Sequence, residues 1–258
     1  MRRTMLTFLV GVLLLCMPAA AQTVDEVISK NIQAHGGPDK LKAVRSMRLS
    51  GRMTLGQGLE APITIEVKRP MQLRMEFTFQ GMTAVQAYDG AMGWQIMPFM
   101  GKEDPEPLSA DDLKEVREQA DLEGPLMEYK AKGHQVELMG KETVEGTECY
   151  KLKLTRKEGD VSFIFLEADS WLEIRMTARR MVRGNELEIE TSLGDYKEVQ
   201  GLILPHVTEF GRKGSPQKQK ISIDKIELNV ALDDARFKMP EVKPAGPKPA
   251  GTSPPAVF

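Results

Sequence analysis

Apolar and polar residues alternate along most of the chain, starting at Ser46. In the segment SMRLSGRMTL, the side chains of Met47, Leu49 and Met53 fall on one face of an extended chain. The segments PITIEVKRP and QLRMEFTFQG, which follow, repeat this period of two. Such alternation, with Gly or Pro between the segments, predicts antiparallel strands that bury one face.

The stretch AYDGAMGWQIMPFM (87–100) predicts a hairpin, with TAVQAY and WQIMPFM as its strands and DGAMG as its loop. Asp-Gly favours a tight turn, so Asp89 is interpreted as a turn residue flanked by Tyr88 and Trp94. The alternative is a catalytic cluster. A catalytic carboxylate requires an acid or base partner, and none is evident beside Asp89.

Strand patterns resume at His134 and continue to Leu228, which gives about eleven strands in total. Helices do not follow the strands one by one, and this argues against a parallel α/β sheet. No repeat of 20–50 residues is present, and this argues against a propeller or a solenoid. The sequence therefore predicts a mainly β fold of the α+β class, with antiparallel strands.

Two segments have helical spacing instead. TVDEVISKNIQAHGG begins with the capping-box pair Thr23 and Glu26 and ends at two glycines. SADDLKEVREQADLEGPLMEYKAKG (109–133) begins with Ser109 as a helix cap and contains the breaker Gly124-Pro125. The second segment is predicted to be a helical insert that interrupts the run of strands.

The two ends differ in composition from the rest. Residues 1–21 contain a basic start, a short apolar run and an A-x-A site, which predict a signal peptide cleaved after Ala21. Cys16 leaves lipoprotein processing as an alternative, although Leu15 is larger than that route prefers. Residues 241–258 are rich in Pro, Ala and Gly and predict a disordered tail. Residues 22–240 then form one domain.

Charge and motifs exclude several functions. The 35 basic and 37 acidic residues are interspersed, so no basic stripe for nucleic acid is present. No G-x-S-x-G, H-E-x-x-H or P-loop motif occurs. His35, His134 and His206 lie far apart in the sequence, and structural roles are preferred over a shared metal site. The sequence predicts no catalytic residue, metal or cofactor.

Methionine is unusually frequent, with sixteen in the chain. Met47, Met53 and Met75 lie on apolar strand faces. Flexible methionines line surfaces that fit variable apolar partners. The alternative is ordinary filling of a core. A large apolar sheet face with only a short helical cover favours the first interpretation.

The order of these segments resembles a known family. An N-terminal helix ending in AHGG is followed by LKAVRSMRLSGRM, YDGAMGWQIMPF, a helical insert and GDYKEVQGLILPHVTEF. From about Gln22 to Pro240 the chain is similar to the outer-membrane lipoprotein-sorting proteins, the LolA/LolB-like superfamily. The resemblance implies a curved, incomplete antiparallel β-barrel, closed by helices around a hydrophobic cavity. It provides no catalytic motif to transfer.

The resemblance also implies a function. Well-studied members carry lipoproteins through the periplasm by holding their acyl chains, between inner-membrane donor and outer-membrane receptor proteins. Another member is a periplasmic stress sensor. The leading hypothesis is therefore a monomeric periplasmic protein that binds lipid or lipoprotein acyl chains. A sensor or protein-interaction module is the alternative. An enzyme would require Tyr88, Asp89 and a histidine to converge.

The candidate site follows from the apolar strand faces and the hairpin. The expected lipid-cavity residues are Met47, Leu49, Met53, Ile65, Met75, Phe77, Phe79, Tyr88, Trp94, Ile96 and Phe99. The expected lid residues of the helical insert are Leu113, Val116, Leu126 and Met127. The lid is expected to cover the apolar face and to open at Gly124-Pro125.

Overall fold

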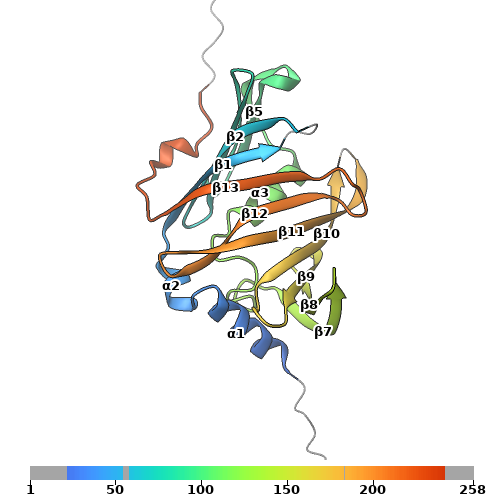
Figure 1. Cartoon of the computed structure of the whole chain (residues 1–258). Helices are drawn as coiled ribbons and strands as arrows, with labels where there is room; N and C mark the ends of the chain where they lie inside the picture. The colour runs from blue at the N-terminus through green and yellow to red at the C-terminus, as the bar shows by residue number, and fades with distance from the viewer. Residues whose placement is uncertain (1–21, 55–57, 183, 242–258) are drawn as a thin grey trace, which may run out of the picture.

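A computed structural model describes residues 22–54, 58–182 and 184–241. The expected signal peptide and residues 242–258 of the expected tail lie outside the described residues. The described chain forms one antiparallel sheet of thirteen strands with three α-helices and two short 3-10 helices (Figure 1). The predicted mainly β, antiparallel fold is confirmed.

The strands are β1 (Ser46–Thr54), β2 (Glu60–Lys68), β3 (Gln72–Phe79), β4 (Met82–Tyr88), β5 (Gly93–Met97), β6 (Lys102–Pro107), β7 (Gln135–Val144), β8 (Thr147–Thr155), β9 (Val161–Glu167), β10 (Glu173–Val182), β11 (Asn185–Val199), β12 (Leu202–Arg212) and β13 (Gln219–Leu228). The helices are α1 (Val24–Ala34), α2 (Pro38–Ala43), α3 (Ala110–Gln119), η1 (Pro98–Met100) and η2 (Asp234–Arg236).

The strand order is β6-β5-β4-β3-β2-β1-β13-β12-β11-β10-β9-β8-β7, so β6 and β7 are the two edges and the sheet is not closed. This is the predicted incomplete barrel, with thirteen strands instead of about eleven. The strand β6 has the sequence KEDPEP and lacks any alternation. Charges and prolines of this kind are typical of an edge strand, where they prevent further pairing.

The pairing register defines two faces of the sheet. Met47 of β1 stands opposite Val67 of β2, which stands opposite Leu73 of β3, which stands opposite Tyr88 of β4. Directly paired residues point to the same side of a sheet. We call this side the inner face, because α3 packs on it against Leu73 and Tyr88. Figure 1 shows α3 behind β12 and β13, with the sheet curving around it.

Residues between β6 and β7 connect the two edges of the sheet. This crossover contains α3, whose Ser109 cap accepts a hydrogen bond from Asp112 N. The helix ends at Gln119 and is followed by turns, so the prediction of a helical segment as far as residue 133 was wrong. Similarly, the predicted strand 94–100 ends at Met97, because Pro98 starts the 3-10 helix η1.

Two buried clusters hold the inner face at its two sides. One joins α3 to β2, β3 and β4 and contains Val67, Leu73, Tyr88, Val116 and Ala120. The other joins α1 and the end of the crossover to β7, β8 and β9. Its buried members are Val27, Ile28, Leu126, Tyr129, Val136, Tyr150, Leu152, Leu154, Ile164 and Leu166.

Polar contacts fix the C-terminal end of α1 to the sheet. The ring of His35 lies 2.6 Å from Glu173 Oε2 through Nε2 and 2.8 Å from the carbonyl oxygen of Ile203 through Nδ1. Asn31 donates hydrogen bonds to Glu173 Oε1 and to the carbonyl oxygen of Trp171. The predicted capping box of Thr23 and Glu26 at the other end of α1 is confirmed.

The chain after β13 covers part of the outer face. Phe237 is fully buried, and Met239 packs against a cluster that contains Trp94. Glu66, which is 1% exposed, accepts hydrogen bonds from Arg48 (2.9 Å) and Arg236 (2.8 Å). Because this segment packs on the outer face, it does not contribute to the cover of the inner face.

Candidate functional site

The middle of the inner face is largely apolar and lies between its two buried clusters. Leu49 of β1 stands between Ile65 of β2 and Ile226 of β13. Ile221 of β13 pairs with Met53 on one side and with Thr208 of β12 on the other. The row continues into β11, where Leu193 pairs with Thr208.

These side chains differ in burial from a closed core. Leu49, Ile65, Ile221, Ile226 and Leu193 are all only half-buried, although they point to the side on which α3 lies. An apolar surface of this kind, bounded by packed clusters, can accept an apolar ligand without large rearrangement of the sheet. We call the half-buried inner-face residues of β1, β11, β12 and β13 the open floor, which borders the buried side chains of Met53 and Ile223.

The register brings most of the expected cavity residues to the inner face. They are Met47, Leu49, Met53, Ile65, Met75, Phe77, Phe79 and Tyr88. Tyr88 is nevertheless part of the packed cluster under α3, with its hydroxyl donating to the carbonyl oxygen of Gly90. Its role is therefore closer to that of a core residue than to that of an open lining residue.

Phe99 joins this face from outside the sheet. Its ring stacks on Phe77 with a centroid separation of 5.6 Å and meets Phe79 edge-on at 6.3 Å. Because these two phenylalanines point inward on β3, Phe99 of the short helix η1 packs over the inner face of that strand. Phe99 itself remains 37% exposed.

Trp94 and Ile96 lie on the other face, which corrects their expected place in the cavity. Tyr88 pairs with Gly93, so Trp94 pairs with Ala87 and Ile96 with Val85. Neighbouring residues of a strand point to opposite sides. Trp94 is 1% exposed on the outer face, and its indole N–H donates to the carbonyl oxygen of Phe237 at 2.8 Å.

Asp89 has the turn role that the hairpin pattern predicts. Its Oδ1 accepts hydrogen bonds from the backbone N–H groups of Ala91 and Met92, at 2.8 and 2.7 Å. Both contacts belong to the loop itself. The interpretation of this stretch as a hairpin turn is confirmed.

The four expected lid residues divide between two parts of the molecule. Val116 is fully buried in the cluster of β2–β4, and Leu113 packs against it. Leu126 belongs to the other cluster, with α1 and β7–β9. Met127 is also buried. The crossover is therefore anchored on both sides of Gly124-Pro125.

The helix α3 presents a charged side to the opposite part of the sheet. Glu118 Oε2 lies 3.2 Å from Arg156, directly after β8, and 2.5 Å from Arg180 of β10. One turn earlier, Lys114 pairs with Asp160, directly before β9. Sequence reasoning missed this cluster. The sequence contains one signal for it: Arg180 is a charged residue on the same strand face as the apolar Met176 and Ala178, four and two residues earlier.

The histidines bind to separate elements. His35 contacts Glu173 and Ile203, His134 accepts from Lys157 N, and His206 contacts the carbonyl oxygen of Leu204. Within residues 22–54, 58–182 and 184–241, no three His, Cys, Asp or Glu side chains are grouped to hold a metal ion. In the same ranges, no helix has the length and apolar character to cross a membrane.

Cys149 is buried on the outer face of β8. Burial raises the pKa of its thiol, so the reactive thiolate is disfavoured. Cys149 is therefore a packed residue of the fold.

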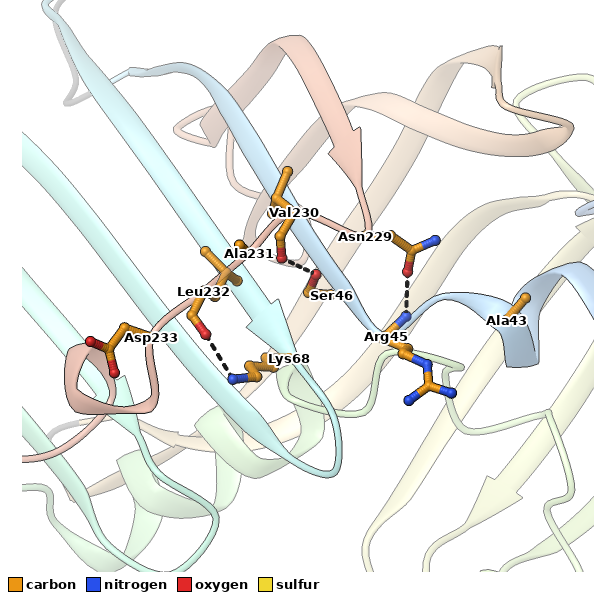
Figure 2. A pocket seen from close by; sticks show the side chains of 9 residues that line it. All are labelled: Ala43, Arg45, Ser46, Lys68, Asn229, Val230, Ala231, Leu232 and Asp233. Atoms are coloured by element: carbon orange, nitrogen blue, oxygen red, sulfur yellow. Dashed lines mark hydrogen bonds between the residues drawn. The ribbon is translucent and has the colours of Figure 1, made fainter.

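A cavity of about 710 Å³ lies between the start of β1 and the C-terminal segment (Figure 2). Its polar groups hold that segment in place. Ser46 Oγ donates to the carbonyl oxygen of Val230, and Lys68 Nζ donates to that of Leu232. Asn229 Oδ1 accepts from Arg45 N. Because these groups are already bonded, the cavity is a weaker candidate than the open floor.

A second cavity, of about 470 Å³, lies between α1 and the end of the crossover. Its apolar lining includes Ile28, Ile32 and Leu126, and Asp25 pairs with Lys130 beside it. This cavity is separate from the open floor, because it borders helix α1, whose buried side chains pack with those of β7–β9.

Comparisons with known proteins support the fold at low sequence identity. No family model and no curated protein matches the chain. A DUF1329 family protein from Desulfovibrio piger has a similar structure, with a TM-score of 0.58 and 14% identity over 84% of this chain and 98% of that one.

Two further solved structures have TM-scores of 0.55. A putative outer membrane lipoprotein-sorting protein domain from Vibrio parahaemolyticus is 11% identical, over 82% of this chain and 94% of that one. A LolA superfamily protein from Nitrosomonas europaea is 14% identical, over 84% and 98%. The half-barrel described above is therefore a LolA-like fold, the fold of the lipoprotein-sorting proteins that the sequence resembles.

Proposed function

We propose that this protein is a non-enzymatic carrier that binds acyl chains of lipids or lipoproteins on the inner face of its half-barrel. The observation that supports the proposal is the open floor. Its apolar side chains Leu49, Ile226, Ile221 and Leu193 lie on β1, β13 and β11 and are only half-buried, with Thr208 of β12 between Ile221 and Leu193.

The physical reason is the cost of an exposed acyl chain. Burying one methylene group gains about 0.8 kcal/mol, so a chain of about sixteen carbons is strongly driven onto an apolar surface. Methionines on this face, such as Met47 and Met75, adapt to a flexible chain without needing exact shape. The floor and η1 together offer such a surface, with Phe77, Phe79 and Phe99 at its end.

The proposal includes an extracytoplasmic place of action. Residues 1–21 would direct export and be removed after Ala21, which leaves a periplasmic domain of residues 22–240 and a short tail. The similarity in fold to the Vibrio parahaemolyticus lipoprotein-sorting domain agrees with this. Donor and receptor proteins in the two membranes would then be the partners of a monomeric carrier.

Extraction of the protein with organic solvent tests the proposal. The full chain, purified from the periplasm without detergent, should release lipid or lipopeptide in a molar ratio near one, as measured by mass spectrometry. A domain with no extractable lipid, which also fails to bind an apolar fluorescent probe, would contradict the carrier function.

The alternative is a sensor or protein-interaction module with the same fold. The cavity between α1 and the crossover favours it, because its lining combines apolar and charged side chains and lies away from the floor. Substitution of Ile32 by Glu would place a charge in this cavity. Loss of a protein partner in this variant, with lipid content unchanged, would support the alternative.

A further inference from the structure

The inner face is apolar along the floor and charged at one side. Ala178 of β10 pairs with Ser162 of β9, and Arg180 lies two residues further on the same face. Arg156 follows β8, and Asp160 precedes β9. The side chains of Arg156 and Arg180 are only 11% and 26% exposed. Because Arg180 pairs with Leu187 of β11, its guanidinium lies on the same side of the sheet as the open floor.

The helix α3 separates these two environments. Leu113, Val116 and Ala120 pack toward β2–β4, whereas Lys114 and Glu118 pair with residues around β8–β10. Residues four apart share one side of a helix, so Lys114 and Glu118 form a single charged side. The two arginines converge on the carboxylate of Glu118.

The charge cluster is incompletely bonded. Glu118 holds both arginines through Oε2, and its buried Oε1 has no hydrogen-bond partner among the described residues. The hydroxyl of Ser162, a residue only 4% exposed, also lacks one in this part of the chain. Buried polar groups without partners are costly. A ligand with several oxygens on one anionic centre can bond the arginine pair more fully than one carboxylate oxygen does.

We propose that Arg156 and Arg180 form a head-group site, that the ligand is an amphiphile with an anionic carboxylate or phosphate head, and that Glu118 occupies this site when the ligand is absent. The inference rests on the proposed function, because the floor must hold the acyl chain. The head group then displaces Glu118 from the arginines, while the chain lies along β11–β13. The site selects anionic over neutral lipids.

The test compares two fluorescent probes that differ only in the head. Parinaric acid carries a carboxylate, and its methyl ester is neutral. Wild-type full chain should bind the acid about tenfold more tightly than the ester, since one charge-assisted hydrogen bond is worth at least that ratio. In Arg180→Gln the ratio should fall close to one. The matched control is Arg179→Gln, on the outer face and 75% exposed, which should keep the wild-type ratio.

A second variant should increase the ratio of the affinity for the acid to the affinity for the ester. Glu118→Gln removes the competing carboxylate, so affinity for the acid should rise about tenfold while affinity for the ester stays the same. Glu188→Gln, which affects an outer-face pair with Lys213, is the control. Displacement of bound ester by oleate or by lysophosphatidate then distinguishes a carboxylate head from a phosphate head.

The outcomes separate the two proposals. Equal affinity of wild type for acid and ester would overturn the head-group site and leave the carrier function intact. An equal rise in affinity for both probes in Glu118→Gln would also overturn it. Glu118 would then block the entry of any apolar ligand and would not compete with an anionic head group for the arginines. If neither probe binds, both proposals are wrong. Thermal melts confirm that each variant is folded.

Discussion

Two regions of the inner face share the same alternating pattern and have different covers. Near β8, Leu152 and Leu154 are fully buried under α1 and the end of the crossover. On β1 and β13, Leu49 and Ile226 face the same side and are only half-buried. The first region is a core and the second is a floor, although the strands have the same type of sequence.

The difference shows that the cover decides what an apolar strand face does. A leucine under a packed helix loses contact with water and contributes about 2 kcal/mol or more to the free energy of unfolding. A leucine on the floor leaves part of its area in water, and the proposed acyl ligand would cover that area. Its contribution to binding can therefore exceed its contribution to stability.

The largest expected effect is on the packed region. Leu152→Ala removes a fully buried side chain and should lower the free energy of unfolding by about 3 kcal/mol. Leu49→Ala should lower it by less than about 1 kcal/mol, because its side chain is already partly solvated. Urea denaturation of both variants measures the difference. Equal losses would show that the floor is a core.

The reverse contrast is expected for binding. Leu49→Glu places a charge on the floor and should weaken binding of a neutral apolar probe at least tenfold, which is about 1.4 kcal/mol. Ser50→Glu adds the same charge to the adjacent residue, which points to the outer face. It should bind like wild type in a fluorescence titration. Weakening by both variants to the same degree would contradict a ligand on the inner face.

The sequence predicted the strands better than their surroundings. Alternation in β1, β2 and β3 was sufficient to place every second residue of these strands, such as Met47 and Phe79, on one face. A period of two depends only on neighbouring residues of the same strand. The position of Trp94 depended on the length of the turn. The loop places Gly93 opposite Tyr88, and a shift of one residue reverses the face.

Other contacts could not be predicted from the sequence, because they join segments that are far apart along the chain. Glu66 pairs with Arg236, and Arg180 pairs with Glu118, through turns that no local pattern encodes. The segment after β13 buries Leu232 and Phe237, which are separated by the charged residues Asp233, Asp234 and Arg236. Single apolar residues of this kind carry too little signal for periodicity. The barrel shape was predicted from the resemblance to a known family. The face on which each residue lies was established by the strand register in the structure.

A smaller effect is expected at the anchor of α1, which contributes to the packed region. Both partners of the His35 ring, Glu173 and the carbonyl oxygen of Ile203, are hydrogen-bond acceptors. Only the doubly protonated imidazolium donates to both. Burial lowers the pKa of His35, but the hydrogen bond and the charge of Glu173 outweigh it, so the pKa is raised above 6.5. Burial raises the pKa of Glu173, and its contacts with His35 outweigh this, so it lies below 4.5.

The signs of these two shifts define the pH range. The stabilisation from His35 is fully present below about pH 6.5 and is lost as the pH rises through its raised pKa in the folded protein. The stabilisation from Glu173 is present above about pH 4.5 and is lost as the pH falls through its lowered pKa. His35→Gln should therefore cost on the order of 1 kcal/mol at pH 5.5 and less at pH 9. An equal cost at both values, from thermal melts, would disprove the ion pair.

The smallest effect is expected at the C-terminus and sharpens the contrast between covered and uncovered apolar surface. The segment through Met239 covers Trp94 and contributes Phe237 to the core, whereas the residues after Pro240 are Pro-rich and contain few apolar side chains able to pack. A chain that ends at Pro240 should melt within about a degree or two of the full chain, since about 1 kcal/mol corresponds to only a few degrees in a domain of this size.

A chain that ends at Leu232 is the matched control. It loses Phe237 and the Arg236–Glu66 pair, which leaves a buried carboxylate with one partner fewer, and it should melt many degrees lower. A large drop for the first truncation would show that the tail also covers apolar surface, and the floor would then be the first place to look for it.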